Sequence, residues 1–364
     1  MTSLYVDLET GWRGGQGQAL LTLRWLRKLG QPAELVAARG CPLAQRAAAE
    51  GIVVHEVGAL GVRWQCARLL RRLLGTSRYA LVHANEPHAL TAAWLARAHR
   101  RVPLVFSRRV AYPLGQSPLA LARYRAAKRI LAISRFVAAS VIESGIAPGH
   151  VETVYEGVEV PELPTAECRD RARQRWGVRA DETLLGCVGY LLPEKGQLQL
   201  VQALAGVRKQ FPQCRLILAG DGPSRAELEQ LVRELGLGEA VIFAGFVEDI
   251  AQMYAALDAF VFPSLAEPLG TSLLAAMAWG LPVVAVARGG VPEIVEDGRT
   301  GLLVDAPDPA LLAESIVRLL SDAGLAKRLR QAARENIEQQ FSAERMAANT
   351  LRVYQEQCAE GGNE

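Results

Sequence analysis

The sequence contains no uncharged apolar stretch of about 18 residues, the length that a membrane-spanning helix needs. A membrane span is therefore not expected. Residues 1–7 enter an apolar, strand-like run directly and contain neither the basic region nor the longer apolar region of a secretory signal. We expect a cytoplasmic protein on this basis.

Cysteines and aromatic residues are scarce. None of the six cysteines forms a Cys-x-x-Cys pair or stands at metal-ligand spacing from a histidine, so reduced thiols are expected. Aromatic residues make up 6% of the chain and hydrophobic residues 50%, which is typical of an α/β protein rich in Ala, Leu and Val. A chain of 364 residues exceeds one ordinary core and favours two domains.

Acidic residues are absent from Pro87 to Ile142. Residues 1–150 hold 21 Lys and Arg against 7 Asp and Glu, a net charge of +14, so the remainder of this +3 chain carries −11. Nearly all these cations are Arg, the better bidentate partner of phosphate and carboxylate groups. The excess predicts an anionic partner for the N-terminal half. Solvated helix faces in an Arg-rich chain remain the alternative.

Short apolar runs alternate with amphipathic segments along the N-terminal half. The expected strands are Leu4–Leu8, Glu34–Ala38, Val53–Val57, Leu81–His83, Leu104–Phe106, Ile130–Ala132 and Val151–Val154. The helices expected between them include Gln18–Leu29 and His88–His99. This alternation indicates a parallel, doubly wound sheet.

The pattern restarts after a linker that contains Pro161 and Pro164. The expected strands are Leu184–Val188, Arg215–Ala219, Val241–Ala244, Ala259–Phe262, Pro282–Ala285 and Gly301–Val304. The expected helices are Gln197–Gln210, Ser224–Glu234, Ile250–Ala256, Thr271–Trp279, Pro309–Ser321 and a last one from Ala343 to about Cys358. The chain therefore predicts two similar α/β halves.

Two well-separated segments of the second half carry the sharpest signal. Pro193-Glu194-Lys195-Gly196 follows an expected strand, and the segment Pro263–Pro282 places Glu267 in a loop before a helix that starts at Gly270. The start of a helix presents free N–H groups and the positive end of the helix dipole. An anionic ligand is expected there.

These segments resemble the donor site of the family 4 glycosyltransferases, also called glycosyl transferases group 1. The resemblance covers most of the chain and is strongest from about Ala132 to Ser321. Further motifs follow in the family's order: Ile133-Ser134-Arg135, Val154–Val158, Ala219–Pro223, Phe243–Val247 and Gly289–Glu293.

The resemblance implies the α/β fold called GT-B, with two Rossmann-like doubly wound domains facing a central cleft. We expect an N-terminal acceptor-binding domain over 1–160, a nucleotide-sugar-binding domain over 161–342, and a C-terminal helix over 343–364 that crosses back onto the first domain. It also implies a transferase that moves a sugar from a nucleotide-diphosphate sugar with retention of anomeric configuration.

The resemblance also implies roles for single residues. Lys195 would contact the donor diphosphate, and Glu267 would orient hydroxyls of the donor sugar. The remaining donor contacts would come from Gly14, Gly15, Tyr190, Phe246, Val247, Leu269, Gly270, Thr271 and Ala275, with the base near Phe246–Val247. No Asp-x-Asp metal site follows a strand, so no metal or cofactor is expected beyond the donor, with UDP favoured over ADP and GDP.

The chain departs from the family pattern at three places. Ala275 stands where a second Glu normally binds ribose hydroxyls, and Tyr190 stands where many members carry an Arg. Ser107-Arg108-Arg109 replaces a His after the strand Leu104–Phe106. Arg108 and Arg109 are expected either to bind an anionic acceptor or to lie on the surface. His83 and His88 flank Asn85-Glu86 at another strand end, where a structural role is favoured over a role in the cleft.

The glycine-rich segment Gly11–Gln18 is expected to be a loop between the first strand and the first helix, near the donor phosphates. Arg63, Trp64, Arg68, Arg71 and Arg72 recur at helical spacing among leucines, which predicts either a membrane-surface helix or an ordinary packed helix. The acceptor is expected to be an anionic cell-envelope glycan or lipid-linked saccharide, such as a lipopolysaccharide core, which would place the protein on the inner face of the plasma membrane.

Two other functions stay open, and a third is not expected. A degenerate nucleotide-sugar-binding protein with little transferase activity would explain the three departures. A Rossmann oxidoreductase would explain the first glycine-rich segment, although its spacing is not Gly-x-Gly-x-x-Gly and it leaves the Glu267 region unexplained. Nucleic-acid binding has no aromatic-basic motif behind it and is not expected.

Overall fold

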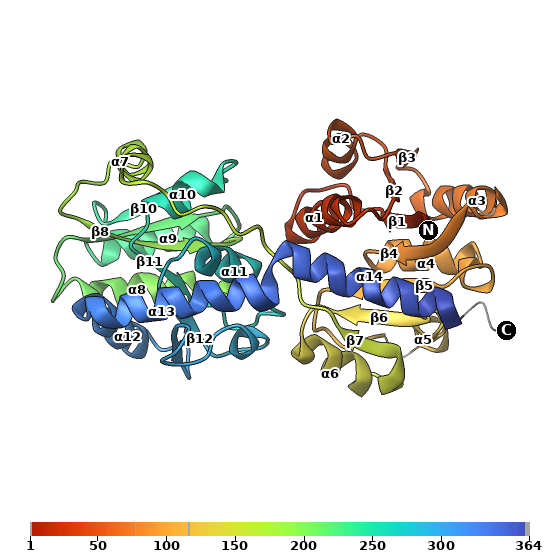
Figure 1. The fold of residues 1–364 in the computed structure, drawn as a ribbon. Coiled ribbons are helices and arrows are strands. Elements are labelled where there is room, and N and C mark those ends of the chain that lie inside the picture. Colours follow the sequence, from red (N-terminus) through yellow and green to blue (C-terminus); the bar gives the residue numbers. More distant parts are fainter. Residues whose placement is uncertain (1, 77, 116, 361–364) are drawn as a thin grey trace. The chain divides into compact units, whose positions relative to one another are not determined.

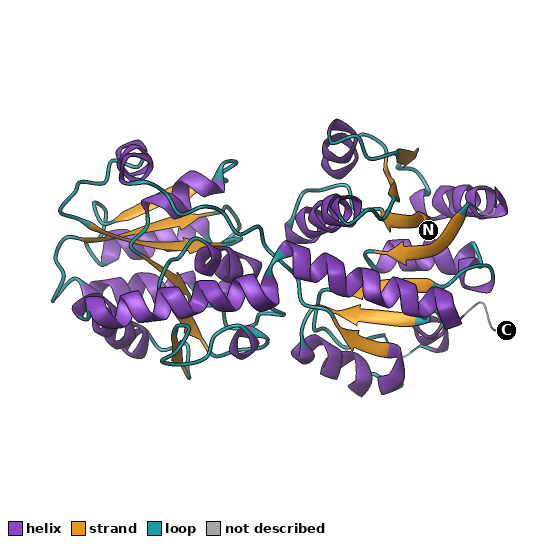
Figure 2. Cartoon of the chain, viewed as in Figure 1, coloured by secondary structure: helices purple, strands orange, loops and turns teal. Residues whose placement is uncertain are grey.

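The computed structural model describes residues 2–76, 78–115 and 117–360. The chain divides into two compact units: unit 1 comprises Met1–Gly157 with Ala343–Glu364, and unit 2 comprises Val158–Ser342. Each unit is a parallel sheet with helices on both faces (Figures 1 and 2). The chain is therefore an α/β protein built from two Rossmann-like sheets, as the alternation of strands and helices predicts.

The sheet of unit 1 has seven strands in the order β3-β2-β1-β4-β5-β6-β7, all parallel. The strands are β1 (Thr2–Asp7), β2 (Ala33–Ala38), β3 (Val54–Val57), β4 (Tyr79–Ala84), β5 (Leu104–Arg108), β6 (Arg129–Ala132) and β7 (Val151–Thr153). The helices are α1 (Gly14–Lys28), α2 (Pro42–Ala49), α3 (Val62–Leu73), α4 (Pro87–Leu95), α5 (Pro118–Arg125), α6 (Arg135–Glu143) and α14 (Ala343–Glu360).

The sheet of unit 2 has six parallel strands in the order β10-β9-β8-β11-β12-β13. The strands are β8 (Thr183–Val188), β9 (Cys214–Ala219), β10 (Val241–Gly245), β11 (Ala259–Phe262), β12 (Val283–Val286) and β13 (Leu302–Val304). The helices are α7 (Ala166–Arg175), α8 (Gln197–Val207), α9 (Arg225–Glu234), α10 (Ile250–Ala256), α11 (Thr271–Ala278), α12 (Pro309–Ser321) and α13 (Ala323–Asn336), which a π-helical turn, Ile337–Phe341, follows.

The strands of both sheets are mostly apolar because helices cover each sheet on both faces. The side chains of β11 and β12 are buried at every position, and most of those of β4 and β5 are buried as well. The C-terminal helix α14 packs in unit 1 against α1, where Thr22 contacts Met346. Within the described ranges, no helix combines the length and the apolar character that a membrane crossing needs.

The strand orders fix where ligands are expected. In unit 2 the chain runs outward from β8 to β10 and then returns to β11, so the order reverses between β8 and β11. In unit 1 the corresponding reversal lies between β1 and β4. Open parallel sheets bind ligands beyond the carboxyl ends of the strands at such a switch point.

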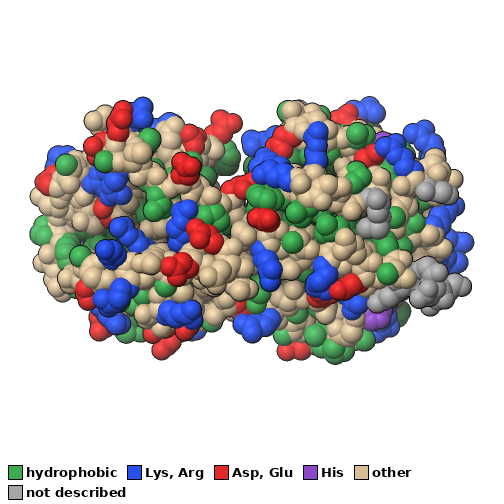
Figure 3. All heavy atoms as spheres, in the orientation of Figure 1, with side chains coloured by type: hydrophobic (Ala, Val, Ile, Leu, Met, Phe, Trp, Pro, Cys, Tyr) green, Lys and Arg blue, Asp and Glu red, His purple; other side chains and the backbone are tan. Residues whose placement is uncertain are grey.

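Charge is divided unevenly between the units. Unit 1 holds 23 Lys and Arg against 13 Asp and Glu, a net charge of +10, whereas unit 2 holds 18 against 25, a net charge of −7. The contrast is weaker than that between residues 1–150 and the remainder because unit 1 also includes Glu152, Glu156 and the segment 343–364, in which four Glu outnumber two Arg. In the view of Figure 3, side chains of both signs are interspersed on both units, so the imbalance is one of net charge.

Candidate functional site

Lys195 and Glu267 meet at the switch point of unit 2. Lys195 follows β8 and Glu267 follows β11, and Lys195 Nζ lies 2.7 Å from Glu267 Oε2. Ser264, which is buried, donates from Oγ to the same carboxylate oxygen at 3.2 Å. The Glu267 side chain is 11% exposed and that of Lys195 28%, so the pair is partly shielded from water and Lys195 is the more accessible of the two.

Two segments hold the loop that carries Glu267. Leu265 N–H donates to Glu194 O at 2.8 Å, and Gly290 N–H donates to Glu267 O at 2.9 Å. A Cβ on Gly196 would lie 2.0 Å from Pro263 O, and a Cβ on Gly289 would lie 2.0 Å from Glu267 O. Only glycine permits these approaches, so the backbone of both neighbours sets the position of the Glu267 carboxylate.

Helix α11 begins directly after this loop. Gly270 has φ of +115°, a conformation that glycine adopts readily, and no side chain caps the helix N-terminus. The first N–H groups of α11, from Thr271 onward, are therefore available to an anion. Ser272 Oγ donates to Val188 O at 3.0 Å and joins the start of α11 to the end of β8.

The other predicted donor residues of unit 2 differ in exposure. Tyr190 and Phe246 are 53% and 73% exposed, and Val247 is partly buried. Ala275 lies on α11 four residues after Thr271, on the same face, and is partly buried. Leu269 is 1% exposed, so its side chain packs inward and only its backbone could reach a ligand.

The prediction of a loop at Gly14 and Gly15 was wrong, because both residues lie in the first turn of α1. The helix starts early since Arg13 and Gln16 satisfy the first turn: Arg13 N–H donates to Gln16 Oε1 at 3.2 Å. Neither glycine has a positive φ, and a Cβ on Gly15 would meet Arg109 Cδ at an ordinary 3.6 Å. Close backbone packing therefore does not require glycine here, although the N-terminus of α1 faces the region of Arg109.

Arg109 lies in a polar cluster at the switch point of unit 1. Its Nε donates to Glu156 Oε1 at 2.7 Å, and its Nη1 donates to Asn85 Oδ1 at 2.6 Å. Asn85 also accepts from Tyr5 OH at 2.5 Å and donates to Asp7 Oδ2 at 2.6 Å. This cluster joins the carboxyl ends of β1 and β4 to the segments that follow β5 and β7.

The surface alternative for Arg108 and Arg109 was wrong. Arg108 is 6% exposed and donates to Tyr112 O, and the side chain of Arg109 is 17% exposed. The guanidinium of Arg109 is already paired with Glu156. An incoming anion would therefore compete with that carboxylate.

Glu86 caps the start of α4. Its carboxylate accepts from the N–H groups of Leu8 at 3.2 Å, Ala89 at 2.6 Å and His88. Burial raises the pKa of Glu86 to about 7, against the opposing effect of these hydrogen bonds. Oxygen and nitrogen atoms of Glu9, Glu86 and His88 lie within 4.8 Å of one another, which makes them the group among the described residues that could hold a metal ion.

His83 is structural, as expected. It is 1% exposed, its Nδ1 lies 2.5 Å from Tyr354 OH, and its Nε2 lies 2.7 Å from Ser107 Oγ. Burial lowers the pKa of His83 well below its usual value, so the ring is neutral at pH 7. The contact between His83 on β4 and Tyr354 on α14 holds this helix against the sheet. His88 is exposed instead and lies beside Glu9.

Comparison with known sequences identifies the family. The family "Glycosyl transferases group 1" matches residues 169–336, and "Glycosyltransferase Family 4" matches residues 12–161. D-inositol 3-phosphate glycosyltransferase of Salinispora arenicola is 32% identical over 316 residues, which cover 78% of this chain and 70% of that protein. The chain belongs to the family 4 glycosyltransferases.

One further relative and one solved structure are similar to this glycosyltransferase over different shares of its length. A GDP-mannose-dependent phosphatidylinositol monomannoside mannosyltransferase of Mycolicibacterium smegmatis is 34% identical over 182 residues, about half of each chain. The crystal structure of HepE from Anabaena in complex with UDP and glucose has a TM-score of 0.83 at 26% identity and covers 96% of this chain and 98% of that one. The solved neighbours carry the two-domain GT-B fold that the resemblance implies.

Sequence reasoning missed several residues of both switch points in this glycosyltransferase. Ser264 and Ser272 position the Glu267 loop and α11, and Asn85 and Glu156 hold Arg109. Ser264 and Ser272 lie within the motif segment and Asn85 follows a strand, which is the available signal. Nothing near Glu156 in the sequence indicates its partner.

Proposed function

We propose that this glycosyltransferase transfers a sugar from a UDP-sugar, with retention of configuration and without a metal ion. The observation that carries the proposal is the Lys195–Glu267 pair, 2.7 Å apart at the switch point of unit 2 and beside the uncapped N-terminus of α11. A cation, free N–H groups and a carboxylate are the groups that a diphosphate joined to a sugar would need.

Similarity to solved complexes supports uridine as the base. HepE from Anabaena has been crystallised with UDP and with UDP-glucose, and it is 25–27% identical to this chain over nearly its whole length. The base would lie near Phe246 and Val247, and exposed Tyr190 would replace the usual Arg with a neutral donor.

Each group of the pair takes a separate part in the reaction. Lys195 and the N–H groups of Gly270 and Thr271 stabilise the diphosphate as negative charge develops on the leaving group. Glu267 exchanges its contact with Lys195 for hydroxyls of the donor sugar and orients the anomeric carbon. The acceptor hydroxyl approaches on the side of the leaving group, and a phosphate oxygen takes its proton. This front-face course retains the configuration.

The acceptor is an anionic glycan or lipid-linked saccharide of the cell envelope, of the lipopolysaccharide-core type, bound by unit 1. Its net charge of +10 supports this choice. The exposed Arg63, Arg68 and Arg72 of α3, together with Trp64 at 63% exposure, support contact with an anionic membrane surface. Arg71 is less available because it donates to Leu95 O.

Calorimetry with UDP, ADP and GDP tests the donor. We expect metal-independent binding of UDP to the wild type, equal in EDTA and in Mg²⁺. Lys195→Ala should weaken it by about tenfold or more, since a charge-assisted contact is lost. Lys209→Ala removes an exposed cation of the same unit and should leave binding unchanged. Equal binding to Lys195→Ala, or binding only with Mg²⁺, would contradict the proposal.

Product stereochemistry and vesicle binding test the remaining parts. NMR of the product formed from an α-linked UDP-sugar should show an α-linkage, and a β-linkage would exclude retention. The wild type should co-sediment with vesicles that contain anionic lipid. A smaller fraction of the Arg63/Arg68/Arg72→Gln variant should do so. Equal sedimentation of both proteins would exclude α3 as the membrane contact.

A nucleotide-sugar-binding protein with little or no transferase activity is the second candidate. Ala275 favours it, because this partly buried position of α11 offers no acceptor for a ribose hydroxyl. UDP binding without any turnover of UDP-sugars in the presence of envelope glycans would support this candidate. Turnover that Lys195→Ala abolishes would exclude it.

A further inference from the structure

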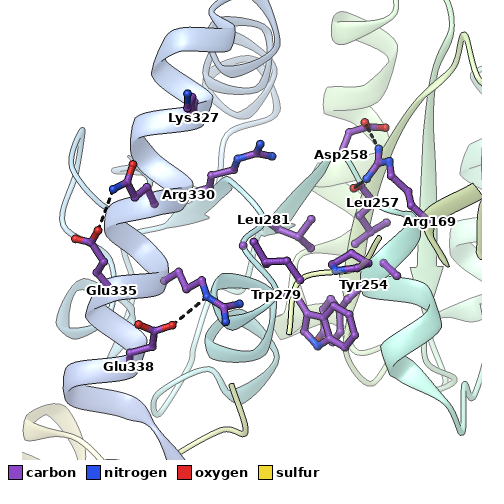
Figure 4. A pocket seen from close by; sticks show the side chains of 16 residues that line it. Arg169, Tyr254, Leu257, Asp258, Trp279, Leu281, Lys327, Arg330, Glu335 and Glu338 are labelled. Atoms are coloured by element: carbon purple, nitrogen blue, oxygen red, sulfur yellow. Dashed lines mark hydrogen bonds and ion pairs between the residues drawn. The ribbon is translucent and has the colours of Figure 1, made fainter. Parts of the chain in front are cut away.

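A cavity of about 610 Å³ lies in unit 2 (Figure 4). It lies at the opposite end of the strands from the Lys195–Glu267 pair. Leu257 and Asp258 directly precede β11 and Leu281 precedes β12, so the cavity opens at the amino ends of these strands. Its volume is typical of small-molecule sites. The donor groups, by contrast, follow the carboxyl ends of the strands, so this cavity is a separate place.

The floor of the cavity is apolar and aromatic. Trp279 is its partly exposed member, Tyr254 and Leu281 are 3% and 6% exposed, and the rings of Tyr254 and Trp279 stack at 6.3 Å between centroids. Leu163, which is 56% exposed, stands at the rim. A flat ring in a ligand would find a complementary surface here.

Most charged groups around the cavity are already paired. Arg169 donates to Asp258 Oδ1 at 2.6 Å, and Arg334 donates from Nε to Glu338 Oε1 at 3.0 Å. Arg334 also donates to Ala278 O at 2.7 Å, which ties α13 to the end of α11. These pairs therefore shape the wall of the cavity.

Two cations of the cavity wall, both on α13, have no partner among the described residues. Lys327 and Arg330 are exposed, lie one turn apart, and make no hydrogen bond or ion pair with any described residue. Figure 4 shows Arg330 extending from α13 toward the side of the cavity where Leu281 lies. Two adjacent cations suit a phosphate group. Glu335, farther along α13, accepts from Gln331 Nε2 at 3.1 Å through Oε1, and its second oxygen could accept from a ligand hydroxyl.

We propose that this cavity is a second ligand site, which binds a phosphorylated ring compound that carries free hydroxyls, and that its occupation changes the affinity of the donor site. A sugar phosphate and a nucleoside monophosphate share this chemistry. The phosphate contacts Lys327 and Arg330, the ring packs on Trp279 and Leu281, and the hydroxyls face Glu335.

Helix α11 links the cavity to the donor site. Its first residue, Thr271, belongs to the donor region, and Trp279 and Gly280 at its other end line the cavity. Tyr254 OH, from the cavity floor, donates to Ser272 O in the first turn at 3.1 Å. A ligand that packs on Trp279 therefore acts on one end of the helix directly and on the other through the Tyr254 ring that stacks on Trp279. This coupling rests on the proposed function of the donor site, whereas the binding itself does not.

Calorimetry with glucose 6-phosphate and with AMP tests the binding and distinguishes the two sources. Glucose, adenosine and inorganic phosphate serve as incomplete probes, and UDP at saturation keeps AMP from the donor site. We expect one of the two phosphates to bind with one-to-one stoichiometry and the incomplete probes to bind at least about tenfold more weakly. If neither phosphate binds better than inorganic phosphate does, the proposal is wrong.

Variants of exposed residues show where the ligand binds. Lys327→Ala with Arg330→Ala should weaken binding by about tenfold or more, whereas Arg328→Ala, an exposed neighbour outside the cavity, should change it less than about twofold. Leu163→Trp should block the rim and abolish binding. If the double variant binds as tightly as the wild type, the cavity is not the site.

The coupling has its own measurement. The Kd of UDP is determined with and without the saturating ligand, and the Kd of the ligand with and without UDP. Linkage requires that the two ratios agree, and we expect a change of about fivefold. Ligand binding with an unchanged Kd of UDP would overturn the coupling alone. Failure of UDP to bind at all would instead overturn the proposed donor site.

Discussion

Lys195 Nζ lies 2.7 Å from Glu267 Oε2, although the two residues are 72 positions apart in the chain. Each follows one of the two strands between which the strand order of unit 2 reverses. The ion pair therefore marks the place where the topology of the sheet leaves room for a ligand. A bound diphosphate sugar would separate the two charges, with the cation on the phosphate and the carboxylate on the sugar.

Glu267→Gln should separate donor turnover from nucleotide binding. Loss of the carboxylate loosens the sugar, and misplacement of the reacting carbon costs about 100-fold in kcat. UDP lacks the donor sugar that Glu267 would hold, so its Kd should change less than about threefold. Release of UDP from a UDP-sugar gives the rate, and calorimetry gives the Kd.

Glu194→Gln is the matched control, because the Glu194 side chain is exposed and only its carbonyl oxygen holds the loop. It should leave both quantities unchanged. If Glu267→Gln weakened UDP binding as much as Lys195→Ala does, Glu267 would act on the diphosphate and not on the sugar.

Ala275→Glu should tighten the binding of UDP. A carboxylate on this face of α11 could accept from ribose hydroxyls, and such a contact contributes about 1.5–3 kcal/mol, or roughly tenfold in Kd at the lower limit. The gain should be smaller for 2′-deoxy-UDP, which lacks one hydroxyl, and smaller for Ala275→Gln. Calorimetry gives the Kd of UDP and of 2′-deoxy-UDP for the wild type and for both variants.

The effect of Ala275→Glu on turnover distinguishes the two candidate functions. A large gain in kcat would indicate that the natural chain has lost catalytic competence. An unchanged kcat with tighter UDP would indicate a natural site that binds the ribose by other groups. An equal gain for UDP and 2′-deoxy-UDP would contradict the assignment of this position to the ribose.

The strands were the most predictable part of the fold. Apolar runs such as Ala259–Phe262 locate buried parallel strands because they are short, bounded by turn residues and rich in aromatic and β-branched side chains. Helix ends were less predictable. Helix α4 ends at Leu95, before the expected His99, because Arg97 adopts a left-handed conformation with φ of +57°. Helix α13 was absent from the expected elements, although Asp322 caps its start.

The candidate site was predictable only where a motif lies on one continuous segment. Lys195 and Glu267 were found because each stands in a recognisable turn. Asn85, Arg109 and Glu156 were not connected, since they lie on three separate segments that only the order of strands in unit 1 brings together. The sequence contains the strands but not their order, so these hydrogen bonds could not be derived from it.

Tyr354→Phe should destabilise unit 1. The substitution removes the hydroxyl that meets His83 Nδ1 at 2.5 Å in a fully buried environment. A buried polar atom left without a partner costs about 1–3 kcal/mol of the free energy of unfolding. Urea denaturation should show this loss, and hydrogen exchange should be faster in α14. Tyr112→Phe, at a side chain that is 73% exposed, should have no effect on either. If Tyr354→Phe changed the free energy of unfolding as little as Tyr112→Phe does, the structural role of the His83–Tyr354 contact would be contradicted.

Glu86 should make the protein less stable as the pH rises from about 4.5 to 7. Burial raises the pKa of Glu86 from 4.5 to about 7, so the native state retains a proton that the unfolded state releases in this range. Stability then falls with pH, because the native state binds more protons than the unfolded state does. A shift of this size corresponds to about 3 kcal/mol.

Glu86→Gln isolates this contribution, because an amide does not titrate while its oxygen still accepts from the N–H groups at the start of α4. The free energy of unfolding of the wild type relative to Glu86→Gln should fall by about 3 kcal/mol between pH 4.5 and pH 8. His83, whose lowered pKa acts in the opposite direction, is common to both proteins and cancels in the difference. Glu143→Gln, at an exposed carboxyl, should show a difference of less than about 0.5 kcal/mol. A constant difference between wild type and Glu86→Gln across this range would show that the pKa of Glu86 is not raised in the folded protein.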